Sequence, residues 1–252
     1  CFSGCVPEKL LFTRYITHTG YKSMMKKRLF PTELAYVAGE ALIALGTALT
    51  ALAGFGVSMV VAPAYLFHLK ISEFLPFFSF GVAEYTFQAI LLLFMMILLR
   101  RVRLTFLFSF LTAVLYGWML DGFSALIGFL LPEPSFACRI VLFTAGIMAT
   151  ALGVAFMFRT YISPAVYELF VKKVSEAFSV PIGKFKTAYD LGSLIFAVIL
   201  SFLFYGFMQF RGVRLGTVIC ALVNGPLITL FGKLLDRLFA FRDKLPWRSF
   251  FE

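Results

Sequence analysis

The tetrapeptide Thr50-Ala51-Leu52-Ala53 returns one hundred positions later as Thr150-Ala151-Leu152-Gly153. Pro63-Ala64 returns in the same order as Pro164-Ala165, and the offset between matched elements drifts only from about 100 to 108. Further matched pairs are Gly81 and Gly183, Gln88 and Asp190, Ala113 and Ala221, Tyr116 and Asn224, and Gly117 and Gly225. Loop insertions produce a drift of this kind. The sequence therefore predicts that the hydrophobic part of the chain is duplicated.

The composition is that of an integral membrane protein. Hydrophobic residues make up 61% of the 252 residues and charged residues only 14%, which leaves too little polar surface to cover a water-soluble core. The long apolar runs, in a chain with 33 Phe residues, show no alternation of apolar and polar residues, so they favour helices over barrel strands.

Six stretches are near or above the ~20 residues that a helix needs to cross a bilayer. They are Leu34–Val57, Phe80–Leu99, Leu104–Leu130, Ile140–Phe158, Ala188–Phe210 and Leu215–Leu238. Three fall in each half, and an odd number of spans inverts the second copy relative to the first. We therefore predict an all-α membrane protein with six transmembrane helices arranged as two inverted three-helix repeats.

Basic residues predict the orientation and the domain limits. If there are six spans, 19 of the 23 Lys and Arg residues lie on one side of the membrane, which the positive-inside rule makes the cytoplasmic side. We expect a cytoplasmic N-terminal segment (1–30), a first repeat (31–134), a second repeat (135–238) and a cytoplasmic C-terminal tail (239–252). The net charge of +10 then reflects topology and contact with anionic lipid headgroups rather than nucleic-acid binding.

A proline interrupts the pattern after the first and the fourth spans. We expect short interfacial or re-entrant helices there, at Ala64–Glu73 and Ala165–Phe178. In the second, one face is apolar, which is typical of an interfacial helix. That face consists of Val166, Leu169, Phe170, Val174 and Phe178.

Small residues concentrate in the first span of each half, at Gly39 and Gly46 and again at Gly146 and Gly153. Small residues let membrane helices approach closely. The first and fourth spans are therefore the expected central pair, and Thr32 is the expected N-cap of the first span.

The polar residues inside the spans are the candidate site, because a charge in hydrocarbon costs ~3 kcal/mol or more and is kept where it has a role. Glu40 is the strongest candidate, since no basic residue lies within one turn of it on its own helix. It would bind a cationic substrate, carry a coupling proton, or only tie helices together. Glu84 and Gln88 follow in the second span, one turn apart.

The second half offers three further substrate-binding candidates. Asp190 matches Gln88, which would place the two on opposite sides of one central cavity; the alternative is a cap or an ion pair with Lys186. Arg159 either binds an anionic group or reaches the membrane interface. Asn224 either contacts substrate or marks a kink before Pro226, and because it matches Tyr116 we expect a site dominated by the second half.

Catalytic and metal-binding patterns are missing from the sequence. It contains no Walker loop, no G-x-S-x-G and no H-E-x-x-H, so we expect no enzyme activity and no cofactor. The four scattered Cys and two His residues lack metal-ligand spacing. Asp121 is expected to pair with Arg139 or Arg214.

The second half resembles the YczE/YyaS/YitT group of bacterial membrane proteins. The residues that carry the resemblance are Gly183-Lys184-Phe185-Lys186 with Asp190, Val213-Arg214-Leu215-Gly216-Thr217-Val218, and Ala221-Leu222-Val223-Asn224-Gly225-Pro226. The similarity spans about Leu34 to Asp236, but Phe108-Ser109 and Trp118 depart from it in the first half. It implies a multi-pass protein of the bacterial plasma membrane and contributes no substrate.

The leading hypothesis is a permease-like transporter of a small solute, coupled to a proton or an ion. The alternative is a non-transporting accessory or substrate-capture subunit that works with a partner protein. Expected partners are the lipid bilayer with its anionic headgroups, a small-molecule substrate, and either further copies of the chain or a partner subunit.

Overall fold

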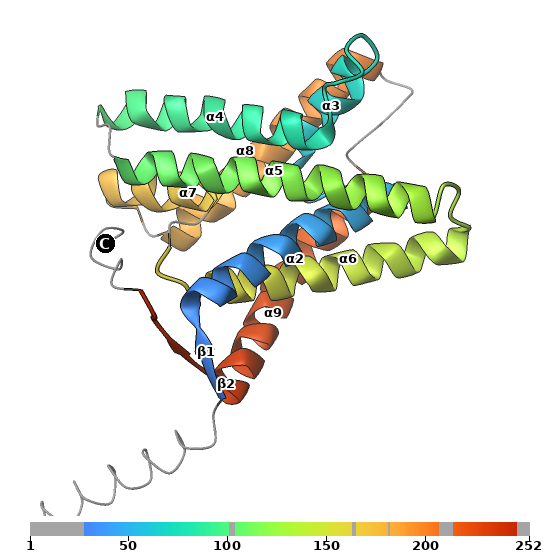
Figure 1. The fold of residues 1–252 in the computed structure, drawn as a ribbon. Coiled ribbons are helices and arrows are strands. Elements are labelled where there is room, and N and C mark those ends of the chain that lie inside the picture. Colours follow the sequence, from blue (N-terminus) through green and yellow to red (C-terminus); the bar gives the residue numbers. More distant parts are fainter. Residues whose placement is uncertain (1–27, 101–103, 163–164, 181, 207–213, 246–252) are drawn as a thin grey trace, which may run out of the picture.

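The computed structural model describes residues 28–100, 104–162, 165–180, 182–206 and 214–245 (Figure 1). Within these ranges, six helices are long and apolar enough to cross a membrane, which confirms the predicted number of spans. The long helices are α2 (Thr32–Ala53), α4 (Phe80–Leu99), α5 (Leu104–Leu130), α6 (Phe136–Met157), α8 (Ile182–Tyr205) and α9 (Leu215–Leu238). The N-terminal segment with its two cysteines, and Pro164, lie outside the described residues.

Helix α2 ends earlier than its hydropathy indicates. Gly54 adopts a left-handed conformation with φ of 71° and stops the helix after Ala53, not at Val57, because glycine takes this conformation without steric cost. The start also differs from the prediction. Pro31 is the N-cap residue, and Thr32 instead donates its hydroxyl proton to the carboxylate of Asp243 at 2.8 Å.

Two short helices, α3 (Ala62–Ile71) and α7 (Val166–Ala177), follow α2 and α6. Pro63 lies within the first turn of α3 instead of preceding it, which a proline tolerates because the first N–H groups of a helix need no partner inside the helix. The apolar face of α7 packs against α4 and α5. Its buried residues are Val166, Leu169, Phe170 and Val174, whereas Phe178 is 59% exposed.

Helices α2 and α6 have the most extensive contact of any two helices among the described residues and run antiparallel (Figure 1). A methyl group added to Gly46 would lie 2.6 Å from the carbonyl oxygen of Gly146, and one added to Gly153 would lie 2.7 Å from that of Gly39. No Cβ atom fits at such distances. The four predicted glycines therefore permit this contact.

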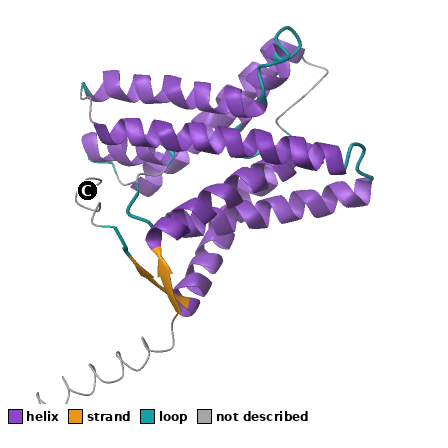
Figure 2. Cartoon of the chain, in the orientation of Figure 1, coloured by secondary structure: helices purple, strands orange, loops and turns teal. Residues whose placement is uncertain are grey.

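The remaining helices pack around this pair in matched combinations. Helix α5 packs on α2 and α9 on α6, while α4 contacts α3 and α7, and α8 contacts α7 and α3. Two combinations break the match: α5 packs extensively on α4 and also contacts α7, but among the described residues α9 has no comparable contact with α8 or with α3. Figure 2 shows α9 descending away from the upper helices.

Asp121 fixes the start of α4 against α5. Its carboxylate accepts hydrogen bonds from the Ser79 hydroxyl at 2.5 Å and the Gly81 amide at 2.7 Å. This is the side-chain cap that the N-terminal end of a helix requires. The predicted ion pair with Arg139 or Arg214 was wrong, because the nearby N-terminus of α4 already satisfies both carboxylate oxygens.

A two-stranded parallel sheet, which the sequence did not predict, joins the two ends of the described chain. Strand β1 (Arg28–Pro31) pairs with β2 (Phe239–Arg242). The Glu33 carboxylate extends this connection by accepting hydrogen bonds from the amides of Lys244 and Leu245. The first span therefore begins at the same face of the helix bundle at which the last span ends.

Candidate functional site

Three of the predicted site residues are buried in the interior of the helix bundle. Glu40 is 3% exposed, Glu84 is fully buried and Gln88 is 1% exposed. Glu40 projects from α2, and the other two project from α4, one turn apart. Buried carboxyl groups are costly unless a proton, a hydrogen-bond donor or a cation satisfies them, so the partners of each group define what it can do.

Glu84 and Gln88 hold the N-terminal end of α7. The hydroxyl of Tyr167 donates to Glu84 Oε1 at 2.9 Å, and the amide of Val166 donates to Gln88 Oε1 at 3.2 Å. Burial, and next the carboxylate of Glu84, raise the pKa of Tyr167 well above its usual value. Tyr167 therefore remains protonated and keeps donating to Glu84.

Glu40 has a different environment. Neither of its carboxylate oxygens accepts a hydrogen bond from a described residue, although both are buried. Tyr36, Tyr116 and Glu168 lie close enough to interact with it electrostatically. No Lys, Arg or His side chain in the described part of the chain forms an ion pair with Glu40 or Glu84.

Two tyrosine–threonine hydrogen bonds connect α2 to α5 beside Glu40. The Tyr116 hydroxyl donates to Thr47 Oγ1 at 3.0 Å, and the Tyr36 and Thr112 hydroxyls share a hydrogen bond of 2.5 Å. Tyr116 also interacts electrostatically with both Glu40 and Glu84, so it lies near both carboxyl groups.

We call this set of side chains the acidic cluster. It consists of Glu40, Glu84, Gln88, Tyr116, Tyr167 and, at its half-buried edge, Glu168. Sequence reasoning found the two span carboxylates and the glutamine but not the tyrosines. The spacing signal was available: Tyr36 lies one turn before Glu40, and Thr112 one turn before Tyr116, which places each pair on one helix face.

Asp190 borders this cluster without belonging to it. It is half-buried on α8, and the neighbouring Tyr189 interacts electrostatically with Glu168, Asp190 and Glu84. Tyr189 therefore connects Asp190 to the cluster. The prediction that Gln88 and Asp190 face one another across a single cavity stays a prediction.

Arg159 and Asn224 lie elsewhere, on the side where α6 packs against α9. The Arg159 guanidinium binds the carboxylate of Asp236 at 2.7 Å and donates to the carbonyl oxygens of Gly232 and Ala155 at 2.6 Å. In this structure the Arg159 guanidinium therefore donates its hydrogen bonds to acceptors of the protein itself rather than to a ligand. Asn224 is half-buried, and its buried Oδ1 accepts no hydrogen bond within the described residues.

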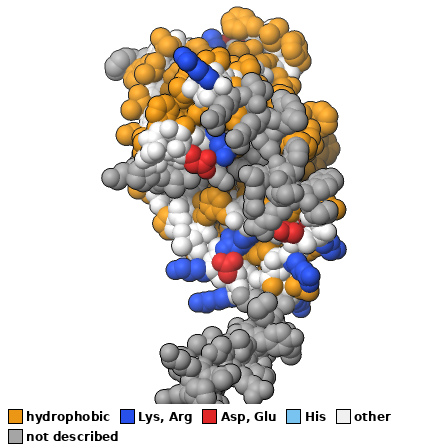
Figure 3. All heavy atoms as spheres, turned by 90° about the vertical axis from the view of Figure 1, so that its left-hand side faces the viewer, with side chains coloured by type: hydrophobic (Ala, Val, Ile, Leu, Met, Phe, Trp, Pro, Cys, Tyr) orange, Lys and Arg blue, Asp and Glu red, His pale blue; other side chains and the backbone are white. Residues whose placement is uncertain are grey.

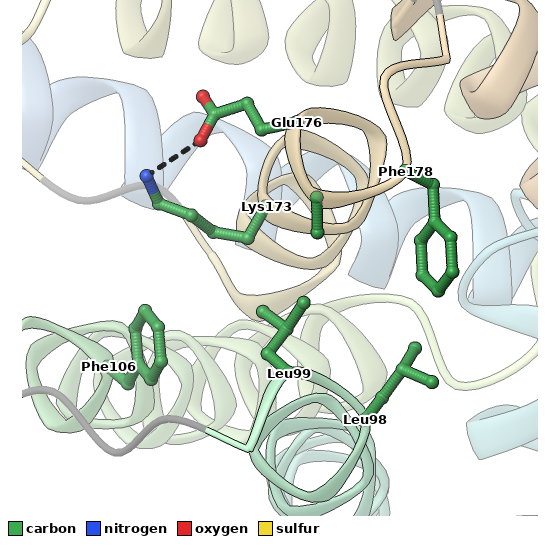
Figure 4. Close-up of a pocket in the computed structure, with 7 residues that line it drawn as sticks. Leu98, Leu99, Phe106, Lys173, Glu176 and Phe178 are labelled. Atoms are coloured by element: carbon green, nitrogen blue, oxygen red, sulfur yellow. Dashed lines mark hydrogen bonds and ion pairs between the residues drawn. The ribbon is translucent and has the colours of Figure 1, made fainter.

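Two surface pockets also lie away from the cluster. The larger, of about 570 Å³, is lined by the end of α4, the start of α5 and the end of α7, and the Lys173–Glu176 ion pair crosses its rim (Figure 4). The second, of about 550 Å³, surrounds Arg159 between α6 and α9. Neither is lined by a residue of the acidic cluster.

The comparisons with known proteins identify a family but no activity. Residues 30–233 match the model of a family described as "Family of unknown function (DUF6198)". No curated protein and no solved structure matches the chain. The narrower resemblance to the YczE/YyaS/YitT group stays a prediction.

Proposed function

Since the chain belongs to this family of unknown function, DUF6198, we propose from its architecture that it is a small-solute transporter that works by alternating access. The proposal places it in the bacterial plasma membrane with both ends in the cytoplasm. The observation that carries it is the acidic cluster: two carboxyl groups in the membrane interior without a basic partner among the described residues. A purely structural bundle would gain stability by replacing them with apolar side chains.

The arrangement of the helices supports two inverted repeats. Gly46 meets Thr150 and Gly146 meets Thr50, so residues one hundred positions apart exchange roles across the α2–α6 contact. The surrounding contacts repeat in the same manner, α5 on α2 corresponding to α9 on α6. An approximate two-fold axis through this crossing accounts for both observations, and many secondary transporters have such an axis.

The larger broken match, the contact of α5 with α4, suggests how access alternates. In the first half, Gly81 and Gly117 bring α4 and α5 into backbone contact, since a methyl group on Gly81 would lie 2.1 Å from the carbonyl oxygen of Gly117. The matched Gly225 on α9 has no neighbouring atom within 4 Å. We propose that this state has a closed first half and an open second half, and that the opposite state closes α9 onto α8 through Gly183 and Gly225.

Charge supports the proposed orientation. Figure 3 views the face at which α4 ends and α7 lies, and Lys and Arg side chains are visible over it, most of them in its lower part. Exposed basic residues of this face include Arg100, Arg242 and Lys244. Positive charge is retained on the cytoplasmic side during insertion.

A reversible cross-link tests the proposed motion and the function together. Gly183→Cys with Gly225→Cys, in a background without the four native cysteines, should form a disulfide in proteoliposomes under mild oxidation. Uptake of a defined mixture of small metabolites, followed by mass spectrometry, should then fall to the level of empty liposomes and return after reduction. The matched control is Gly192→Cys with Gly128→Cys, two other glycines of α8 and α5 that have no neighbouring atom within 4 Å.

Each result has a defined meaning. If both introduced cysteines react with a maleimide but never with each other, the closing of α9 onto α8 is wrong. If the wild-type protein binds a solute but accumulates none, the accessory substrate-capture role replaces transport.

A further inference from the structure

Four buried polar atoms of the acidic cluster have no hydrogen-bond partner among the described residues. Three of them are acceptors, namely both carboxylate oxygens of Glu40 and Oε2 of Glu84, and one is a donor, Nε2 of Gln88. Gln88 lies one turn from Glu84 and interacts with its carboxyl group, so Glu40 is the residue of the cluster whose oxygens have no donor among the described residues. Buried polar atoms are nearly always paired in native proteins, so a group of this size needs an explanation. The excess of acceptors indicates the kind of partner that would complete the cluster, namely a group that donates several hydrogen bonds, and a positively charged donor would also offset the carboxylate charge.

We infer that the acidic cluster is the binding site for a small cation that bears N–H groups, such as a primary ammonium or a guanidinium. This inference rests on the proposed transport function and names its substrate class. An ammonium group has three donors and no acceptor, which complements three unpaired carboxylate oxygens. Charge-assisted hydrogen bonds of this kind are about twice as strong as neutral ones.

The neighbouring side chains fit the same ligand class. Tyr116 interacts electrostatically with both Glu40 and Glu84. Tyr36 lies near Glu40, and Tyr167 donates a hydrogen bond to Glu84. Aromatic rings attract ammonium and guanidinium groups through their negative faces. Glu168 adds a third carboxylate at the half-buried edge of the site.

A metal ion fits this site less well. In the described part of the chain no three His, Cys, Asp or Glu side chains lie close enough to hold a metal ion, whereas hard cations need six or more oxygen ligands. The two carboxyl groups come from different helices, α2 and α4, so a small cation with several N–H donors fits them better than a metal ion that needs a complete shell of oxygen ligands.

The two halves of the molecule differ in the residues at the positions of the acidic cluster. At the positions that match Tyr36 and Glu40 the second repeat has Phe136 and Ile140. The cation site is therefore confined to the first repeat and to α7, which the cluster holds through Tyr167. A ligand that binds here contacts α2, α4 and α7 together.

Thermal unfolding of the purified full chain in detergent, at constant ionic strength, tests the ligand class. Methylammonium chloride should raise the midpoint, because a ligand that binds the folded state stabilises it. Tetramethylammonium chloride, which has the charge but no N–H group, and sodium chloride should not. Glu40→Gln should weaken methylammonium binding by about tenfold or more, the order expected for a lost charge-assisted hydrogen bond.

Glu176→Gln is the control, since this exposed carboxylate lies on α7 and forms only an ion pair with Lys173 at its surface. If Glu40→Gln does not fold, Glu84→Gln gives the same comparison. Equal shifts with methylammonium and sodium, or equal binding by wild type and Glu40→Gln, would overturn the inference. Metabolite uptake without methylammonium binding would support transport and reject this substrate class. Methylammonium binding without uptake would support the cation site and reject transport.

Discussion

At the scale of single residues, the difference between Glu40 and Glu84 is one of partners. Both are buried carboxyl groups in the first repeat, but Glu84 has a fixed donor in Tyr167, whereas Glu40 has none among the described residues. A group with a permanent partner positions its surroundings, and a group without one is available to a ligand. Glu84 therefore orients α7, and in the proposed site Glu40 receives the cation.

Tyr167→Phe should destabilise the protein, because it leaves Glu84 Oε1 buried without its donor. We expect a loss of about 1–3 kcal/mol in the free energy of unfolding, measured by denaturant or thermal unfolding in detergent. Combining it with Glu84→Leu, which removes the acceptor as well, should recover part of the loss.

Tyr161→Phe is the matched control. Burial, and then the Glu33 carboxylate that accepts its proton, raise the pKa of Tyr161 to about 12, so it donates throughout the physiological range. It lies near the surface, where water replaces a lost partner, and its removal should cost less than about 1 kcal/mol. A larger loss of unfolding free energy for Tyr161→Phe than for Tyr167→Phe would contradict the prediction that the buried Tyr167–Glu84 hydrogen bond contributes more to stability.

At the scale of helices, the α2–α6 contact determines how closely the two halves approach. Its glycines leave no room for a side chain, since a methyl group on Gly46 would lie 2.2 Å from Thr150 Oγ1 as well as close to the Gly146 backbone. Backbone atoms cannot yield as the end of a flexible side chain can. The contact is therefore intolerant of any larger residue.

Gly46→Ala should separate α2 from α6 and lower the free energy of unfolding by about 1–3 kcal/mol, the usual cost of overpacking a core. Gly128→Ala on α5 is the control, because no atom lies within 4 Å of the added methyl group. Its stability should be unchanged or slightly higher. Unfolding of both variants in detergent checks the difference, and equal midpoints would show that the contact is not tight.

Local sequence predicted the helices better than it predicted their ends or their partners. Hydropathy gave all six spans, but the left-handed Gly54 ends α2 before its apolar run ends. The strands β1 and β2 have four residues each and pair across the whole chain, so neither carries a periodic signal. The Tyr167–Glu84 hydrogen bond also joins helices far apart in sequence. The expectation of a site dominated by the second half stays a prediction, and the described cluster joins α2, α4 and α5 of the first half to Tyr167 and Glu168 of α7 in the second.

At the scale of the whole molecule, the pairing of β1 with β2 places both ends of the bundle at one face. A chain that crosses a membrane an even number of times must have both ends on the same side. The loop between α5 and α6, which contains the exposed Glu133, lies at the other end of α5 from α7 (Figure 1). Glu133 and Lys244 are therefore two well-separated positions at which chemical labelling can test the predicted topology.

A single cysteine at Glu133 should react with a membrane-impermeant maleimide added to intact cells, whereas one at Lys244 should react only after the cells are opened. Both positions are exposed, so access to the reagent decides the result. The native cysteines are replaced in both variants. Labelling of residue 244 from outside would reverse the proposed orientation.

The strand pair also constrains when the protein can finish folding during synthesis. At the start of the first span, Thr32 donates a hydrogen bond to Asp243, and Glu33 accepts hydrogen bonds from the amides of Lys244 and Leu245. A ribosome delivers those residues only after all six spans have been made. The span that begins at Thr32 therefore gains these hydrogen bonds only after the other five described spans have been made, and a nascent chain that stops before residue 239 would contain all six without them.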